Sequence, residues 1–124
     1  MQGSAKRPAT AQRRRALFLD AVSIVDDEYC EKLALDDVAR RVATSRRQLQ
    51  RAFAEAGETS FRSYLQKVRM ERAAELLREG GSPVNRVATA VGYRQPAQFA
   101  KAFRRHHGAP PSTFRGVAPE SLAA

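Results

Sequence analysis

The 124-residue sequence has one cysteine, Cys30, no tryptophan and no long run of apolar residues. A single cysteine excludes a disulfide within this chain and any metal site that needs several thiolates. No apolar stretch approaches the ~18–20 residues that span a bilayer, so we expect no membrane partner. The basic amino terminus lacks the apolar core of a secretory signal.

Side-chain sets that are typical of enzymes are also missing. No Ser/His/Asp group, no pair of carboxylates and no glycine-rich phosphate loop stands out. A helical wheel puts His106 on an apolar face, and its neighbour His107 points elsewhere, so the two rarely share a metal. We therefore expect a protein that is not an enzyme, with no catalytic residues, no cofactor and no metal.

Acidic residues are in the minority, 13 against 22 Lys and Arg, for a formal charge of +9. Residues 1–15 carry five basic side chains and no acidic one (net +5), residues 16–37 one basic and seven acidic (net −6), and residues 38–124 sixteen basic and six acidic (net +10). The excess favours a polyanionic partner, nucleic acid or an acidic membrane surface. Phosphates repel the acidic stretch 16–37, so we expect it to lie away from nucleic acid; an ordinary solvated helix face is the alternative.

Apolar residues recur at helical spacing from residue 13 onward, and no useful length alternates with the period of a strand. The sequence therefore predicts an all-α fold of about seven helices. We expect them at residues 13–30, 35–42, 45–56, 60–79, 83–91 and 96–107, with a last short turn around Phe114. Residues 1–12 predict a flexible lead, and residues 117–124 a loose tail.

The residues at both ends of the third predicted helix favour its start and its stop. Ser45 and Gln48 have the spacing of a capping box, in which the Ser side chain accepts a hydrogen bond from the backbone three residues on. Gly57 is predicted to stop the same helix. The preceding helix starts after Ala34, which is a poor cap.

Two segments of the chain repeat one pattern. In DDVARRVATSRRQLQRAF and NRVATAVGYRQPAQFAKAF, Val38 matches Val87 at an offset of 49 and Phe53 matches Phe103 at an offset of 50. The change in offset is one extra residue in the second turn. Each copy is a short helix, a tight turn and a longer helix, which is the helix-turn-helix layout that places its second helix in the major groove of DNA.

The second helix of each copy has one apolar and one polar face on a helical wheel. In the first copy the polar face holds Arg46, Arg47, Gln50 and Arg51. Arg and Gln make paired hydrogen bonds to guanine and adenine, so we predict DNA readout, with a solvated basic face as the alternative. The second copy exposes Pro96, Ala97, Ala100, Lys101 and Arg104, and we expect this face to position the protein more than it specifies a sequence.

These segments, together with FRSYLQKVRMERAAELL, resemble the DNA-binding domain of the AraC/XylS family of bacterial transcription regulators over about residues 15–115. The part most similar to the family signature is VATAVGYRQPAQFAKAFRRHHGAPPSTFR. The resemblance implies two helix-turn-helix lobes, at residues 13–57 and 81–116, joined by a long bridging helix within residues 58–80. Ala34 stands where the family often has a Ser or Thr cap, and Pro96 and Ala97 replace polar readers.

The resemblance places the family's base contacts on Arg47, Gln50 and Arg51 in the first reading helix. In the second reading helix it places them around Pro96, Ala97, Gln98 and Lys101. With the wheel, the predicted base contacts are Arg46, Arg47, Gln50, Arg51, Gln98 and Lys101. The predicted contacts to the DNA backbone are Ser45, Arg69, Arg94, Gln95 and Arg104. Arg69 and Arg72 both lie on the bridging helix, and for both the alternative to a phosphate contact is pairing with Glu75 and its neighbours.

The sequence thus predicts sequence-specific binding of double-stranded DNA and regulation of transcription, with the two reading helices in successive major grooves. RNA polymerase is the further expected partner, the chain is expected to bind DNA as a monomer, and its expected place is the cytoplasm, on the nucleoid. Two alternatives are a sequence-indifferent architectural DNA binder and a helical module for an acidic protein. The operator, the regulated genes, the sign of regulation and any effector stay open.

Overall fold

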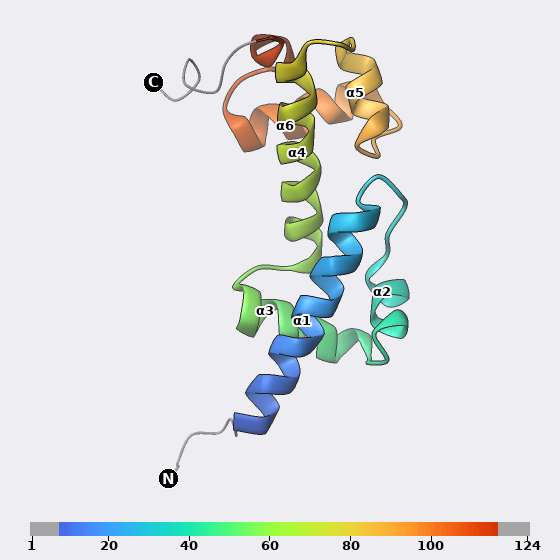
Figure 1. Cartoon of the computed structure of the whole chain (residues 1–124), viewed down its shortest axis with the longest axis vertical. Coiled ribbons are helices and arrows are strands. Elements are labelled where there is room, and N and C mark those ends of the chain that lie inside the picture. The colour runs from blue at the N-terminus through green and yellow to red at the C-terminus, as the bar shows by residue number, and fades with distance from the viewer. Residues whose placement is uncertain (1–7, 117–124) are drawn as a thin grey trace. The chain divides into compact units, whose positions relative to one another are not determined.

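The structure of the chain, a computed structural model, describes residues 8–116 (Figure 1). Within these residues it contains helices and no strand, so the predicted all-α fold is confirmed. The elements are α1 (Pro8–Glu28), α2 (Leu35–Arg41), α3 (Arg46–Gly57), α4 (Phe61–Glu79), α5 (Val84–Ala90), α6 (Pro96–His107) and a short 3-10 helix, η1 (Pro111–Phe114). The predicted tail, residues 117–124, lies outside the described residues.

The prediction of a flexible lead over residues 1–12 is wrong for residues 8–12, which form the first turns of α1. Pro8 suits the start of a helix, because its fixed φ is helical and its missing N–H has no partner to lose there. Ala9, Ala11 and Gln12 continue the helix through intrinsic propensity. They carry no apolar stripe, and periodicity therefore does not reveal them. Residues 1–7 are outside the described part of the chain.

The described chain divides into two compact units, and the division falls inside α4. The first unit comprises residues 8–28 and 33–65, and the second comprises residues 29–32 and 66–116. Residues 58–80, predicted as a bridging segment, are therefore shared: the first turn of α4 packs with the first unit and the remainder with the second.

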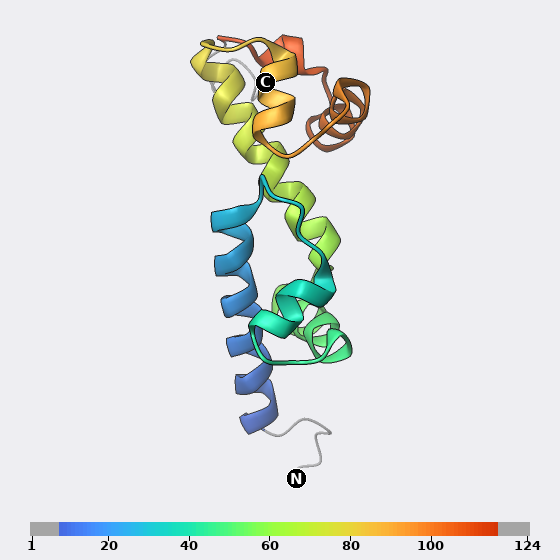
Figure 2. The same cartoon turned by 90° about the vertical axis from the view of Figure 1, so that its right-hand side faces the viewer.

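In the first unit, α1 packs along α3 and also contacts α2, as both views show (Figure 2). Leu49 and Phe53 of α3 are fully buried. The ring of Phe53 meets Phe18 of α1 edge-on, with centroids 5.1 Å apart, and Phe61 at 5.8 Å. The other core residues of this unit are Leu17, Ala21, Val25, Val38, Ala39, Ala52 and Leu65.

α3 ends at Gly57, as predicted, but Gly57 is not the left-handed residue of the helix end. It is the last residue of the helix, and the left-handed residue that follows is Glu58, at φ 53°. A Cβ at Gly57 would lie 2.4 Å from a ring carbon of Phe18. Glycine is therefore required here by the close approach of α1, a contact between residues far apart in the sequence.

In the second unit, α5, α6 and η1 pack on the later turns of α4. Phe99 and Phe103 of α6 are fully buried beside Met70 and Leu77 of α4. The ring of Phe103 lies edge-on to Phe114 of η1, with centroids 5.0 Å apart. These residues match the buried Leu49 and Phe53 of the first unit, as the sequence repeat predicts.

The prediction that His106 faces the apolar side of α6 is wrong. His106 is exposed, and His107 is the half-buried residue. The ring of His107 lies 4.3 Å from that of Phe103 and donates a hydrogen bond from Nε2 to the carbonyl of Met70, at 2.9 Å. At the last turn of α6, Phe114 of η1 and Met70 of α4 lie on the side of His107, and they cover it.

The turns of the two helix-turn-helix copies share one hydrogen-bond pattern. In the first turn Ala43 donates to Arg40 and Thr44 donates to Ala39; in the second, the pairs shift by 49 residues to Gly92–Thr89 and Tyr93–Ala88. The pattern requires a positive φ at its centre, which is 59° at Ala43 and 100° at Gly92. The first copy thus places an alanine where the second has glycine.

We predict opposite effects of exchanging these two residues. Ala43 is exposed, so Ala43→Gly removes only left-handed strain and should stabilise the first unit by about 1 kcal/mol. Gly92→Ala introduces that strain and a Cβ that lies 3.2 Å from the guanidinium of Arg69, and should destabilise the protein by about 1–3 kcal/mol. Urea unfolding followed by circular dichroism measures the free energy of unfolding of each variant. A destabilised Ala43→Gly variant would contradict the claim that Ala43 is strained at its positive φ.

A second prediction concerns pH. Burial lowers the pKa of His107 below its ordinary value of 6.5, more than the Met70 carbonyl raises it. The folded protein therefore favours the neutral ring, and stability that is present above the unfolded pKa is lost as the pH falls through the lower folded pKa. The free energy of unfolding should drop between about pH 7 and pH 5, and His107→Gln should flatten this drop. The exposed His106→Gln should keep it; an equal flattening by both variants would contradict the assignment.

Candidate nucleic-acid interface

The first candidate surface is the exposed face of α3. Ser45 precedes the helix, and its hydroxyl accepts a hydrogen bond from the backbone N–H of Gln48, at 3.1 Å, as predicted. Burial of Leu49, Ala52 and Phe53 turns one face of α3 inward. The predicted base contacts all lie on the exposed remainder: Arg46, Arg47, Gln50 and Arg51.

Part of this face borders a groove of about 360 Å³. Arg46, Gln50 and Ala54, which follow one another at single-turn spacing, line it from α3, and Leu35 lines it from α2. The residues Thr59, Ser60, Phe61 and Arg62 close it at the start of α4. Arg62 is an exposed basic residue outside both reading helices, so neither the repeat nor the helical wheel points to it. It lies in the first turn of α4, which Ser60 caps by accepting a hydrogen bond from the backbone N–H of Ser63 at 3.0 Å.

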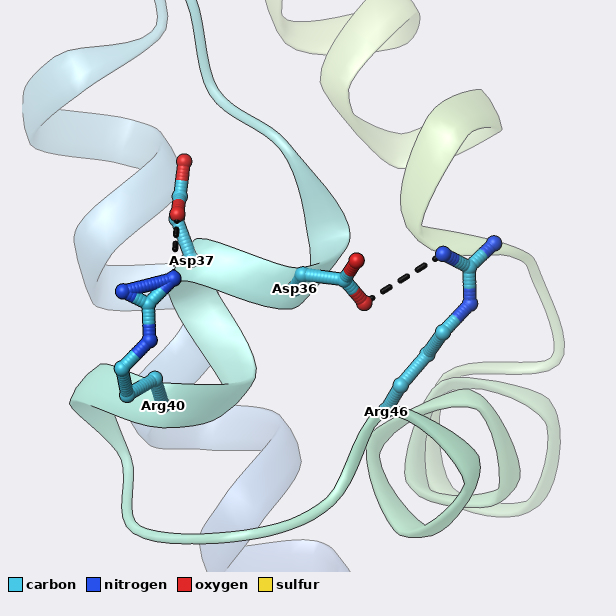
Figure 3. A network of polar contacts seen from close by, with 4 residues as sticks. All are labelled: Asp36, Asp37, Arg40 and Arg46. Carbon is cyan, nitrogen blue, oxygen red and sulfur yellow. Dashed lines mark hydrogen bonds and ion pairs between the residues drawn. The ribbon is translucent and has the colours of Figure 1, made fainter.

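The arginines of α3 differ in their partners. Among residues 8–116, Arg47 and Arg51 form no ion pair, and their guanidinium groups are open to a ligand. Arg46 is held by Asp36 of α2, with Nη1 and Oδ1 3.3 Å apart (Figure 3). Both side chains are about three-fifths exposed, 61% and 62%, and such exposed pairs contribute about 0–1 kcal/mol, so a ligand can displace this one.

The acidic stretch 16–37 is expected to lie away from nucleic acid, yet the structure places its residue Asp36 beside the candidate surface. The tight turn brings the first turn of α2 beside the first residue of α3, which places a carboxylate next to a predicted base reader. Other acids of the stretch have partners elsewhere: Glu28 accepts from Arg41 at 2.6 Å, a bond that lowers the pKa of Glu28, and Asp26 accepts from Tyr64 at 2.9 Å.

The second candidate surface is the exposed face of α6. Pro96 occupies the first turn of the helix, Phe99, Ala102 and Phe103 are buried, and Gln95 precedes the helix without a side-chain capping bond. All predicted contact residues of this unit other than Arg69 are exposed: Arg94, Gln95, Gln98, Lys101 and Arg104. None of the three basic ones is in an ion pair with a described residue.

Arg69 is placed differently from the other predicted contacts. It is half-buried, its Nε donates to the carbonyl of Tyr29 at 2.7 Å, and its Nη2 donates to the carbonyl of Glu31 at 2.8 Å. Its guanidinium also lies over the ring of Tyr93, 5.8 Å from the centroid. Burial lowers the pKa of Arg69. The side chain of Arg69 ties together three segments of the second unit. The predicted alternative of pairing with Glu75 holds for Arg72 and not for Arg69.

Other kinds of site have no support in the described chain. Residues 8–116 contain no group of three His, Cys, Asp or Glu side chains placed to hold a metal ion. None of their helices is both long and apolar enough to cross a membrane. Cys30 is free and exposed.

Comparison with protein families matches residues 38–116 to a model described as a helix-turn-helix domain. The chain is 30% identical over 92 residues to the Msm operon regulatory protein of Streptococcus mutans, covering 74% of this chain and 33% of that protein. It is 32% identical over 106 residues to the uncharacterised helix-turn-helix-type transcriptional regulator YijO of Escherichia coli, covering 86% and 38%. The chain thus spans about a third of the length of these relatives.

Solved structures of transcription regulators have a similar fold. An AraC-type transcriptional regulator from Chromobacterium violaceum superposes with a TM-score of 0.78 at 28% identity, over 90% of this chain and 96% of that one. The DNA-binding domain of the global transcriptional factor AdpA, crystallised with a target DNA, superposes with a TM-score of 0.74 at 26% identity, over 79% and 88%.

Proposed function

The chain belongs to the AraC/XylS-type helix-turn-helix family of transcription regulators, and we propose that it binds double-stranded DNA sequence-specifically through α3 and α6. The observation that carries the proposal is the exposed face of α3, where three arginines and a glutamine lie opposite the buried side chains of Leu49, Ala52 and Phe53. The same arrangement of a buried face and an exposed basic face recurs in α6.

In the first unit, Arg46, Arg47, Gln50 and Arg51 are the proposed base contacts. Arg makes paired hydrogen bonds to the O6 and N7 of guanine, and Gln makes them to adenine. Ser45, exposed at the start of α3, is proposed to contact a phosphate. Exposed, largely unpaired side chains on a helix that its core holds rigidly can make such directional bonds.

In the second unit, Gln98 and Lys101 lie where base contacts are predicted, and Gln98 is the proposed reader. Lys101 is proposed to hold a phosphate, together with Arg94, Gln95 and Arg104, because its ammonium is a point charge without paired donors. This face offers one amide and no arginine for base edges, so it should contribute affinity more than sequence preference. Arg69 is left out of the proposed interface, because its donors hold the carbonyls of Tyr29 and Glu31.

We further propose that the chain binds DNA as a monomer with its two reading helices in successive major grooves, that it works with RNA polymerase, and that its place is the cytoplasm, on the nucleoid. The repeat supports the first point, since one chain already holds two helix-turn-helix copies. A sequence-indifferent binder is the alternative. Competition with random DNA separates the two, because a regulator should prefer its own site by at least ~10³-fold.

The unequal roles of the two helices predict unequal effects of substitution. On a site selected from a random pool, Arg51→Ala and Gln50→Ala should each cost about 1–3 kcal/mol, and much less on random DNA. Lys101→Ala should weaken binding to both DNAs about equally. It should also reduce the slope of log affinity against log salt concentration by about one, the value of one phosphate contact. Binding titrations of each variant on both DNAs at several salt concentrations measure this.

Arg40→Ala is the matched control, because Arg40 is an exposed arginine on the far side of α2 from Arg46 (Figure 3). It loses the same charge without losing a proposed base contact, and should leave the preference for the selected site intact. Circular dichroism should show each variant folded. A loss of preference at one base pair in Lys101→Ala, with Arg51→Ala weakening all sequences alike, would reverse the assigned roles.

The spacing of the two half-sites gives another prediction. α4 has 19 residues, so it is about 28 Å long at 1.5 Å per residue, close to the ~34 Å of one turn of B-DNA. If one chain fills two successive grooves on one face, insertion of half a helical turn between the half-sites should abolish contact by one unit. Footprinting and affinity on the two operators measure the effect, and an unchanged footprint with unchanged affinity would contradict two-groove binding.

A further inference from the structure

We propose that Asp36 is a specificity-determining residue, which orients Arg46 for a base edge and weakens its attraction to phosphates of any sequence. The inference rests on the proposed function of α3 and adds to it a residue of the opposite charge. Neither the charge pattern nor the helical wheel indicates this role, because Asp36 belongs to the acidic stretch and lies on another helix.

Asp36 and Asp37 are neighbours in the first turn of α2 but have different partners. Ala34 offers no side-chain cap, so both carboxylates lie near the unsatisfied N–H groups of the helix start and complement its dipole. Asp37 accepts from Arg40 within α2, at 2.6 Å, whereas Asp36 points across the turn to Arg46 of α3 (Figure 3). Only Asp36 therefore acts on the reading helix.

The geometry of the ion pair leaves Arg46 able to hydrogen-bond a base edge. Arginine has five N–H donors in one plane, and Asp36 engages Nη1 alone, at 3.3 Å. No other described residue hydrogen-bonds the remaining donors of Arg46. The carboxylate can thus restrict the orientations of the guanidinium while a free edge meets the acceptors of a guanine.

The same pair opposes binding to random DNA. Non-specific affinity comes almost entirely from cations that neutralise phosphates and release counterions. A carboxylate beside Arg46 cancels much of its charge and itself repels nearby phosphates, since both side chains are about three-fifths exposed. A guanine, whose two acceptors match the oriented guanidinium, offsets that repulsion; a phosphate alone does so less well.

Asp36→Asn tests the proposal, with Asp37→Asn as the matched control. Both variants remove one negative charge from the same turn of α2, so they share any change in the helix dipole and net charge. Asp36→Asn should raise the affinity for random DNA. It should also steepen the slope of log affinity against log salt concentration by about one, the value of one phosphate contact. Its ratio of affinities for selected over random DNA should fall about fivefold or more, within the range that one base contact carries. Asp37→Asn should leave this ratio unchanged.

A double-mutant cycle assigns the effect to the pair. In an Arg46→Ala background, Asp36→Asn should no longer change the ratio of affinities for selected and random DNA. An unchanged ratio in Asp36→Asn, an equal fall in Asp37→Asn, or a fall that persists without Arg46 would each overturn the inference and leave the proposed function standing. A wild-type chain with no preference between the two DNAs would overturn both.

Discussion

Burial of one phenylalanine at the same place in each reading helix is the constraint on which the two proposed DNA surfaces depend. Phe53 and Phe103 are both fully buried, at matching positions of α3 and α6. Twelve-residue helices are marginal in water without tertiary packing, and burial of such a ring contributes about 1.5–3 kcal/mol. The ring also fixes how the helix is rotated about its axis. The opposite face is exposed for that reason, whatever residues it holds.

The two units stabilise this ring with different neighbours. Phe53 meets Phe18 and Phe61 edge-on, and α1 approaches so closely that Gly57 has no room for a side chain. Phe103 meets Phe114 of the 3-10 helix and the ring of His107. Both units thus pack the reading helix on a long preceding helix, α1 in the first and α4 in the second, and they differ in the segment that follows it, which is the start of α4 in the first and η1 in the second. The same helix-turn-helix copy is completed by a different partner in each case.

Some charged side chains hold groups within their own unit, and others are exposed and free to meet a ligand. Several acidic residues of the first unit neutralise basic or polar groups within it, as Glu28 does for Arg41 and Glu55 does for Arg14. In the second unit, Arg69 holds two carbonyls and a tyrosine ring. The arginines held in these contacts are not available to DNA, whereas Arg47 and Arg51 of α3 and Lys101 and Arg104 of α6 have no ion-pair partner among the described residues. Asp36 is the carboxylate beside the exposed face of α3.

The sequence by itself determined the helices, their repeat and the polar face of α3, because these depend on residues three or four apart or on a fixed offset between two copies. The Ser45 cap and the burial of Phe53 and Phe103 follow from such local patterns. The roles of Gly57, Asp36, Arg69 and His107 were decided by the tertiary structure alone. Each depends on a neighbour from another helix or loop, at a sequence separation of ten to about forty residues. Periodicity along one helix carries no information about which residue of another helix comes to lie against it.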